Sequence, residues 1–442
     1  MDRVVLRVST TPPLQDPLPH ILFSLEYPPG IGGDQRLDLT PLQPMINAYL
    51  TGALAADGVR QLGRHLFDAL MQQPEVAAAF NAAILADRCP VYVYVRGLGI
   101  PETLPWEALW NATARFLSLD ERWPISRMMP TAQNVVTSDI YRPPPRILAV
   151  LSCLDVSARN QWEEIWKGVQ ASPVGVFAEI KVLTSEPELR RHIEDLGDPR
   201  VSAELLHSQR QLEDVAQRFR PHVLHFFSHG TAEPVPQLLL ATASDRAAGL
   251  PETIVLESQQ VKAMCSPDEP PLLVVLNCCK GGQPGGDTLS LAGDLVYQRG
   301  FPAVMGMREQ ILAESADTLA GALYPEIMAI FDELRTPGAT RAVLDWSRLI
   351  VAPRIRLCQA QQGPGAGFST AAANTKEWTV PVLYVRPTAC EVNLEAEAAS
   401  QTDQLSLQLL RGMLAAAGPG TPDSWRETLI AHIARIEAEV AP

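Results

Sequence analysis

The sequence lacks the cysteine patterns that build disulfide frameworks or zinc sites. Its seven cysteines are odd in number and irregularly spaced, and no two of them form a C-x-x-C pair. Cys278 and Cys279 are adjacent, an arrangement that does not supply a zinc knuckle by itself. We therefore expect reduced thiols and a cytoplasmic location.

Long apolar runs and a secretory leader are also missing. No stretch approaches the roughly 20 apolar residues that a membrane-spanning helix needs. The first eight residues carry Asp2 and run quickly into polar sequence, unlike a signal peptide. The sequence therefore predicts a protein without a membrane partner.

Basic residues are outnumbered. The chain has 36 Lys and Arg against 50 Asp and Glu, a formal net charge of −14. This balance disfavours nucleic acid and anionic membranes as partners over most of the surface. The glycine-rich residues 281–286 follow a cysteine and lack the Lys-Ser/Thr of a phosphate loop, so we expect no nucleotide and no other cofactor.

What the sequence does contain is a large apolar fraction in a regular order. Hydrophobic residues make up 46% of the chain and charged residues 19%, enough to bury a sizeable core. Continuous apolar runs typical of strands buried on both faces occur at 146–151, 222–227 and 272–276. Helical spacing is found among other segments at 160–171, 202–218 and 339–354. The alternation predicts an α/β fold with a mostly parallel sheet flanked by helices.

Composition divides the chain into three parts. Residues 1–130 mix strands and helices, and we expect an N-terminal α+β part, with a degenerate half of the fold as one interpretation. Residues 131–145 end in three prolines and are interpreted as a linker. The alternating pattern fills residues 143–390. Residues 391–442 are rich in Ala, Glu and Leu and predict a helical tail.

Two predicted strands end in groups that can do chemistry together. One ends in His229-Gly230 and the other in Cys278-Cys279-Lys280-Gly281-Gly282. Active sites of open α/β sheets gather at the carboxyl ends of strands. An imidazole near a thiol can remove its proton and so create a nucleophile. The glycines leave backbone amides as candidates for an oxyanion hole, namely those of Gly230, Cys279, Lys280, Gly281 and Gly282.

These motifs resemble the CHAT family, relatives of caspases and separase. The resemblance rests on HFFSHG at 225–230, VVLNCCKGG at 274–282, GFPAVMG at 300–306 and LPWEAL at 104–109. It covers about residues 90–387. It implies a caspase-like peptidase domain in residues 143–390 and cysteine endopeptidase activity.

Aligning the family pattern on Asn277 and Gly282 places the catalytic cysteine at Cys279. Cys278 then occupies a position where the family usually has a small residue. Since neighbours on a strand point to opposite faces, we expect Cys278 to be a core residue. His229 is the predicted base, and His225 has either a supporting role or a place in the core.

Two acids are candidates for a substrate pocket. Asp155 follows the strand at 146–151, and in the caspase-like topology this loop helps to form the pocket for the residue before the cut. Asp287 follows the glycine-rich loop. Either carboxylate would favour Arg or Lys. An apolar pocket is the other option.

The resemblance further implies a dedicated protein substrate in bacterial defence or programmed cell death, for example a gasdermin-like pore former. An activating protein would bind the N-terminal part or the helical tail. Two other functions stay open at this point. One is a catalytically silent adaptor or binding module, and the other is a different hydrolase or an acyltransferase that uses the same pair.

Overall fold

The structure is a computed structural model. It describes residues 1–11, 20–30, 32–55, 57–97, 99–132, 139–267, 269–279, 281–283, 289–335, 339–361, 372–394, 407, 409–415, 417 and 423–440.

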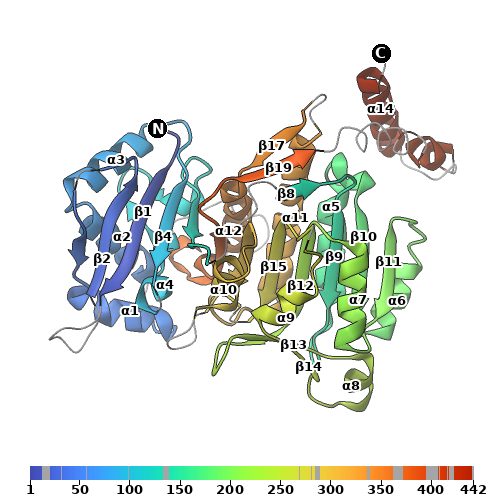
Figure 1. The fold of residues 1–442 in the computed structure, drawn as a ribbon, viewed down its shortest axis with the longest axis horizontal. Coiled ribbons are helices and arrows are strands. Elements are labelled where there is room, and N and C mark those ends of the chain that lie inside the picture. The colour runs from blue at the N-terminus through green and yellow to red at the C-terminus, as the bar shows by residue number, and fades with distance from the viewer. Residues whose placement is uncertain are drawn as a thin grey trace.

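One large sheet runs through these residues (Figure 1). Its first block is parallel, in the order β11 (Val201–Leu205), β10 (Glu179–Thr184), β9 (Arg146–Leu151), β12 (Val223–Thr231), β15 (Leu273–Cys278) and β16 (Ala303–Met307). The apolar runs that predicted strands therefore lie side by side at its centre.

The second block of the same sheet is built mainly from the N-terminal residues. Its order is β18 (Pro381–Val385), β7 (Ile125–Met128), β4 (Val91–Arg96), β1 (Val4–Thr11), β2 (His20–Tyr27) and β3 (Gln35–Leu37). From β18 to β1 the strands are parallel, and β18 is antiparallel to β16 of the first block. The predicted α/β class with a mostly parallel sheet is confirmed.

Helices cover both faces of the sheet, because successive strand residues alternate between two hydrophobic clusters. Leu224 and Phe226 join one cluster, and Val223 and Phe227 join the other. The first cluster includes α1 (Gln43–Leu50), α2 (Gly58–Leu70), α3 (Pro74–Ile84), α7 (Gln209–Phe219), α9 (Ser258–Ala263) and α10 (Leu291–Tyr297). The second includes α5 (Arg159–Gln170), α6 (Pro187–Glu194), α11 (Ala313–Glu333) and α12 (Val351–Ala360).

Smaller elements complete the fold. β13 (Gln237–Leu240), α8 (Ala243–Ala248) and β14 (Ile254–Leu256) form what we call the β13–β14 unit, residues 237–256, which lies below β12 and β15 in Figure 1. The remaining elements are α4 (Ile100–Thr103), β5 (Trp110–Asn111), β6 (Arg115–Phe116), β8 (Asp139–Tyr141), β17 (Arg341–Leu344), β19 (Cys390–Leu394) and α14 (Asp423–Val440). Among the described helices, none combines the length and apolar content needed to cross a bilayer.

Two predicted helices contain strands instead. Residues 202–218 hold strand β11 followed by α7, whose start is fixed by the Ser208 side chain accepting from the Gln211 amide at 3.2 Å. Residues 339–354 begin with β17, which pairs with β19. In both cases a partner distant in sequence supplies the hydrogen bonds, which a local helical pattern does not register.

The pairing of β19 with β17 and β8 changes where the predicted linker and helical tail begin and end. Residues 391–394, expected in the helical tail, belong to β19, and the linker at 131–145 contains β8, which pairs with β19. Residues 423–440 are helical, as the tail composition predicts. The division into three parts stays a prediction.

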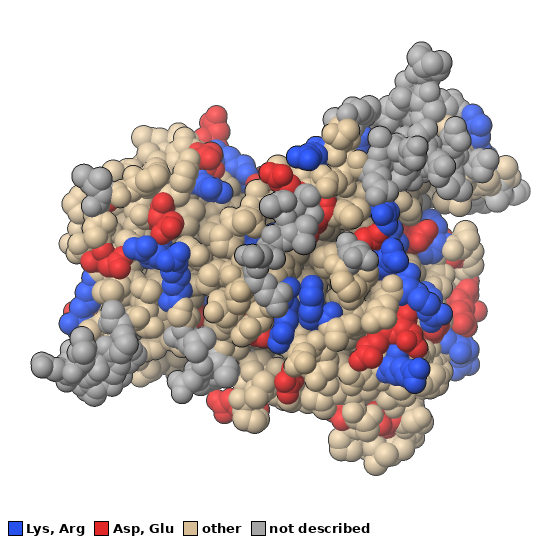
Figure 2. Space-filling view, viewed as in Figure 1, with Lys and Arg blue, Asp and Glu red and all other residues tan. Residues whose placement is uncertain are grey.

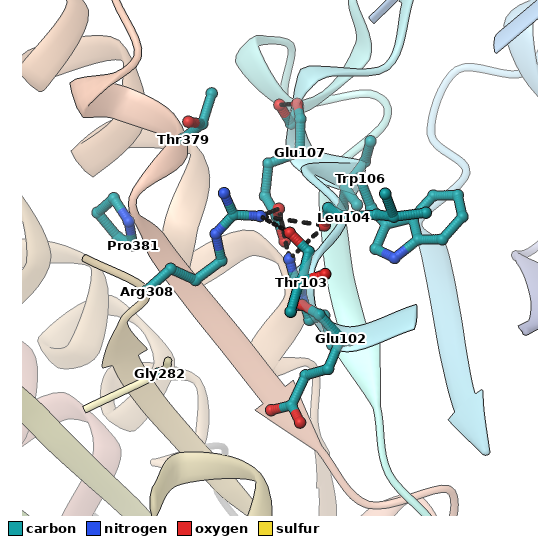
Figure 3. Close-up of polar contacts among 12 residues, drawn as sticks. Glu102, Thr103, Leu104, Trp106, Glu107, Gly282, Arg308, Thr379 and Pro381 are labelled. Carbon is teal, nitrogen blue, oxygen red and sulfur yellow. Dashed lines mark hydrogen bonds and ion pairs between the residues drawn. The ribbon is translucent and has the colours of Figure 1, made fainter. Parts of the chain in front are cut away.

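The segment matching the LPWEAL motif forms a buried ionic centre between the two blocks. Glu107 and Arg127 are fully buried, and the guanidinium donates to both carboxylate oxygens at 2.9 and 2.8 Å. Arg308 donates to the Leu104 carbonyl oxygen at 3.0 Å and points toward Glu107 (Figure 3). Burial alone would raise the pKa of Glu107, but the arginines outweigh it and hold that pKa at about 2.

Replacing Glu107 with Gln should destabilise the fold, because Arg127 would remain buried without its counter-charge. We expect a loss of about 3–5 kcal/mol at pH 7. Since the pKa of Glu107 is lowered on folding, its contribution is complete above the ordinary value of 4.5 and is lost as the pH falls toward about 2. The free energy of unfolding, measured with urea at several pH values between 7 and 3 for wild type and variant, tests this pH dependence.

The matched control is Glu188→Gln, at a carboxylate that is 76% exposed. Equal unfolding free energies for the two variants at pH 7 would contradict the role of Glu107.

Candidate active site

Strand register brings the predicted pair together. β12 and β15 are parallel neighbours, and their last aligned residues are Ser228 and Cys278. His229 is the next residue of β12, and Cys279 is the first residue after the end of β15. The tips of two neighbouring central strands therefore carry an imidazole and a thiol.

Gly230 is required by this close approach. A Cβ atom at this position would lie 2.3 Å from the Cys279 carbonyl oxygen and 3.3 Å from the Cys278 Sγ. Any other residue would push the tip of β15 away from β12. The glycine after His229 thus serves the packing of the two strand tips against each other.

The two adjacent cysteines face opposite sides. Cys278 is 1% exposed within the first hydrophobic cluster, and burial raises the pKa of its thiol. Cys279 is partly exposed, and its Sγ lies 3.9 Å from the Ile311 carbonyl oxygen. The other six cysteines are all buried. Cys279 is thus the accessible thiol.

A third cysteine, Cys153, lies just after β9, the neighbour of β12 on its other side. Leu151 of β9 is aligned with Phe227, and the Ser152 amide extends this ladder by donating to the Phe227 carbonyl oxygen at 2.8 Å. Cys153 follows Ser152 and begins the loop that leads to Asp155. Its thiol is buried, and burial together with the Asp155 carboxylate raises its pKa.

Two carboxylates approach the same nitrogen of His229. The Asp155 Oδ1 lies 2.7 Å from Nε2, and the Glu252 Oε1 lies 3.6 Å from it. The hydrogen bond with His229 lowers the pKa of Asp155. No sequence pattern points to Glu252, because its position beside His229 depends on the path of the β13–β14 unit. The predicted substrate-pocket role of Asp155 stays a prediction.

The loop that carries Asp155 is held in place by Arg246 and Glu186. Arg246 of α8 donates to the carbonyl oxygens of Cys153 and Leu154 at 2.7 and 2.9 Å and pairs with Glu186 at 3.5 Å. Glu186 in turn accepts from the Ala158 amide at 2.7 Å. These contacts hold both ends of the loop, so the carboxylate of Asp155 is presented to the imidazole.

Two predicted oxyanion donors already have partners. The Gly281 amide donates to the Cys278 carbonyl oxygen at 3.5 Å, and the Gly282 amide donates to the Met307 carbonyl oxygen at 2.7 Å, which anchors the segment after Cys279 to β16. The amides of Gly230 and Cys279 stay predictions. Lys280 and Asp287 lie outside the described residues.

His225 lies deeper on the same face as His229. It is completely buried, its Nε2 lies 3.2 Å from Gln161 Nε2, and its ring packs against Tyr324. Burial lowers the pKa of His225 to about 3, so the ring is neutral. These features describe a core histidine rather than a second base.

The fold and the strand tips define the class: an α/β protein whose mostly parallel sheet carries a histidine and a cysteine at the ends of neighbouring central strands. A sequence model of the CHAT domain matches residues 60–343, well over half of the chain, and the protein therefore belongs to the CHAT domain family.

Comparison with solved structures finds gingipains. The crystal structure of the Arg-specific cysteine proteinase gingipain R (RgpB) has a TM-score of 0.41 and 8% identity, with 76% of this chain and 68% of that chain covered. A complex of the pro- and mature domains of Porphyromonas gingivalis RgpB has a TM-score of 0.40 and 8% identity, with 78% of this chain and 71% of that chain covered. No curated protein matches the chain.

Exposure predicts which thiol reacts first. We expect iodoacetamide to modify Cys279 at least roughly tenfold faster than any other cysteine of the folded protein, because the others are buried. Peptide mass spectrometry over a time course gives the individual rates. Faster labelling of Cys278 than of Cys279 would show that Cys278, and not Cys279, is the accessible thiol at the end of β15.

Gly230→Ala should strain the junction of the two tips. Its added methyl group meets the Cys279 backbone at 2.3 Å, and we expect a loss of roughly 1–3 kcal/mol in unfolding free energy. Gly33→Ala is the control, since a Cβ there meets nothing within 4 Å. Equal urea midpoints for the two variants would contradict the close approach.

Proposed function

We propose that the protein is a cysteine endopeptidase that uses His229 and Cys279. The observation that supports the proposal is the register of β12 and β15, in which Ser228 and Cys278, the residues before His229 and Cys279, are aligned at the carboxyl ends of central parallel strands. Membership in the CHAT family supports the same activity.

The contacts of His229 assign a role to each of its nitrogens. Asp155 accepts a hydrogen bond, so Nε2 carries a proton and Nδ1 is left to exchange a proton with Cys279. Asp155 fixes the orientation of the ring and stabilises it when it becomes charged.

The reaction then follows in two stages. Nδ1 takes the thiol proton, and Sγ attacks the peptide carbonyl carbon to form a tetrahedral intermediate. Collapse of this intermediate breaks the C–N bond as the imidazolium gives its proton to the leaving amine, leaving a thioester on Cys279. Water, deprotonated by His229, hydrolyses the thioester and restores the free thiol. Backbone amides near Cys279 stabilise the oxyanion in both stages.

The substrate we propose is one dedicated protein. The family resemblance suggests a role in bacterial defence or programmed cell death, with a gasdermin-like pore former as an example, and activation by a protein that binds residues 1–130 or the C-terminal tail. On the face in Figure 2, Lys and Arg lie among Asp and Glu without one continuous basic surface. This distribution favours a protein substrate over nucleic acid for that face.

Substitution at the strand tips tests the assignment. We expect Cys279→Ala and His229→Ala to abolish cleavage, since each removes one member of the pair, whereas Cys278→Ala keeps most of the activity because that thiol faces the core. The assay incubates each variant with neighbouring gene products or a proteome and maps new protein N-termini.

The wild-type protein provides the reference set of fragments. Fragments that persist with Cys279→Ala but vanish with Cys278→Ala would overturn the assignment. A wild-type protein that produces none, with its activating partner present, would favour the adaptor function.

A further inference from the structure

A cavity of about 660 Å³ opens where two strands of the second block, β4 and β7, come to their ends. Its walls are residues 94–97, residues 129–132 and side chains in and just before α10. β4 and β7 are parallel, and ligands of parallel sheets bind at the carboxyl ends of the strands. Both the position and the volume of this cavity are therefore typical of a small-molecule site.

Backbone hydrogen bonds keep the two strand ends apart. The last aligned pair of β4 and β7 is Tyr94 with Met128. Just after it, the Met129 amide donates to a carbonyl oxygen of β18 at 3.0 Å, and the Ala132 amide donates to the Tyr297 carbonyl oxygen of α10 at 2.8 Å. The chain thus turns away from β4 toward β18 and α10, and the cavity is a fixed feature of the fold.

The cavity is separate from the candidate active site. Met128 is aligned with Val385 of β18, Val385 with Ala303 of β16, and Ala303 with Leu273 of β15. β7 therefore ends level with the beginning of β15, whereas Cys279 follows the other end of that strand. A ligand in the cavity would not occupy the place of a peptide bound at the tips of β12 and β15.

The end of β4 supplies a positive charge to the cavity. The Arg96 guanidinium lies 4.8 Å from the centre of the Tyr94 ring and donates to the Tyr94 hydroxyl at 3.4 Å. Among the residues that the structure describes, Arg96 has no carboxylate as an ion-pair partner. Glu26, whose charge acts on Arg96, is paired with Arg7 at 3.4 Å. The guanidinium is thus oriented by an aromatic ring and keeps donors for an anion.

Much of the remaining wall is apolar or aromatic. Tyr94, Met129 and Leu289 are buried side chains of the lining, and Tyr297 is a half-buried one. Such surfaces bind the aromatic or aliphatic body of a ligand, while a few polar groups fix its orientation.

One acid limits the charge that a ligand can carry. Asp294 of α10 lines the same cavity and accepts a hydrogen bond from the Ser258 hydroxyl. A ligand with a single negative charge can pair with Arg96 at little cost from this acid, whereas a dianion is repelled twice as strongly.

We propose that this cavity binds a small carboxylate with an aromatic or aliphatic body, and that Arg96 pairs with its carboxylate group. The two oxygens of a carboxylate match the paired donors of a guanidinium, and its single charge is the one that Asp294 tolerates. This inference goes beyond the proposed peptidase function, because no residue of the catalytic pair takes part in it.

A matched pair of probes tests the inference on the full chain. N-Acetylphenylalanine carries the carboxylate, and N-acetylphenylalaninamide has the same body without a charge. Binding is followed by the NMR signals of isotope-labelled methionine methyl groups, because Met129 lines the cavity, and its signal is assigned with Met129→Leu. We expect the acid to shift the Met129 signal with a Kd of about 1 mM, and the amide to bind roughly tenfold more weakly.

Two arginine variants locate the charge that is recognised. Arg96→Gln should weaken binding of the acid roughly five- to tenfold and leave that of the amide unchanged. Arg64→Gln is the matched control, at an arginine of α2 whose side chain is 63% exposed, and should behave as wild type. Phenyl phosphate, a dianion at pH 8, should bind more weakly than the acid.

Four results would overturn the inference. They are a Met129 signal that the acid does not shift, equal affinities for acid and amide, an affinity for the acid that Arg96→Gln does not change, and tighter binding of phenyl phosphate than of the acid. None of these measurements depends on peptide cleavage, so the inference and the proposed function fail separately.

Discussion

The alignment of two parallel strands is the constraint on which this site depends. Ser228 beside Cys278 fixes where β12 and β15 end, and Gly230 lets the Cys279 backbone come within a distance that no side chain would permit. Because strand residues alternate between faces, the same register buries Cys278 and leaves Cys279 partly exposed. A slip of one residue would exchange the two thiols, so the register decides which of them is accessible.

Residues of the N-terminal part contact the segments that follow the two strand tips. Glu102, in the segment before the LPWEAL motif, accepts from the Ser290 hydroxyl at 2.5 Å, and burial raises the pKa of this acid. Ser290 caps α10 just after the glycine-rich loop, while Arg308 ties the end of β16 to Leu104. Both contacts cross from the N-terminal block to the segments around Cys279. The LPWEAL motif and the residues just before it thus support the segments around Cys279.

The central strands and the His–Cys pair were predictable because both leave local signals. Apolar runs bounded by His229-Gly230 and Cys278-Cys279 mark buried strands that end in reactive groups, and alternation on a strand separates the two thiols. β11 and β17 were mistaken for helix, because their hydrogen bonds come from strands elsewhere in the chain. Glu252 could not be predicted, since its place beside His229 depends on the path of the β13–β14 unit. The contact of Asp155 with His229 depends in the same way on Arg246, which holds the carbonyl oxygens of Cys153 and Leu154.

The central claim is that His229 and Cys279 face each other across the tips of β12 and β15. A crystal structure of the full chain inactivated with a peptidyl chloromethyl ketone tests this most directly. The account predicts a thioether on the Sγ of residue 279, with the ring of residue 229 beside it and its Nε2 still bonded to Asp155. An adduct on Cys278, or an imidazole turned away from the modified sulfur, would contradict it.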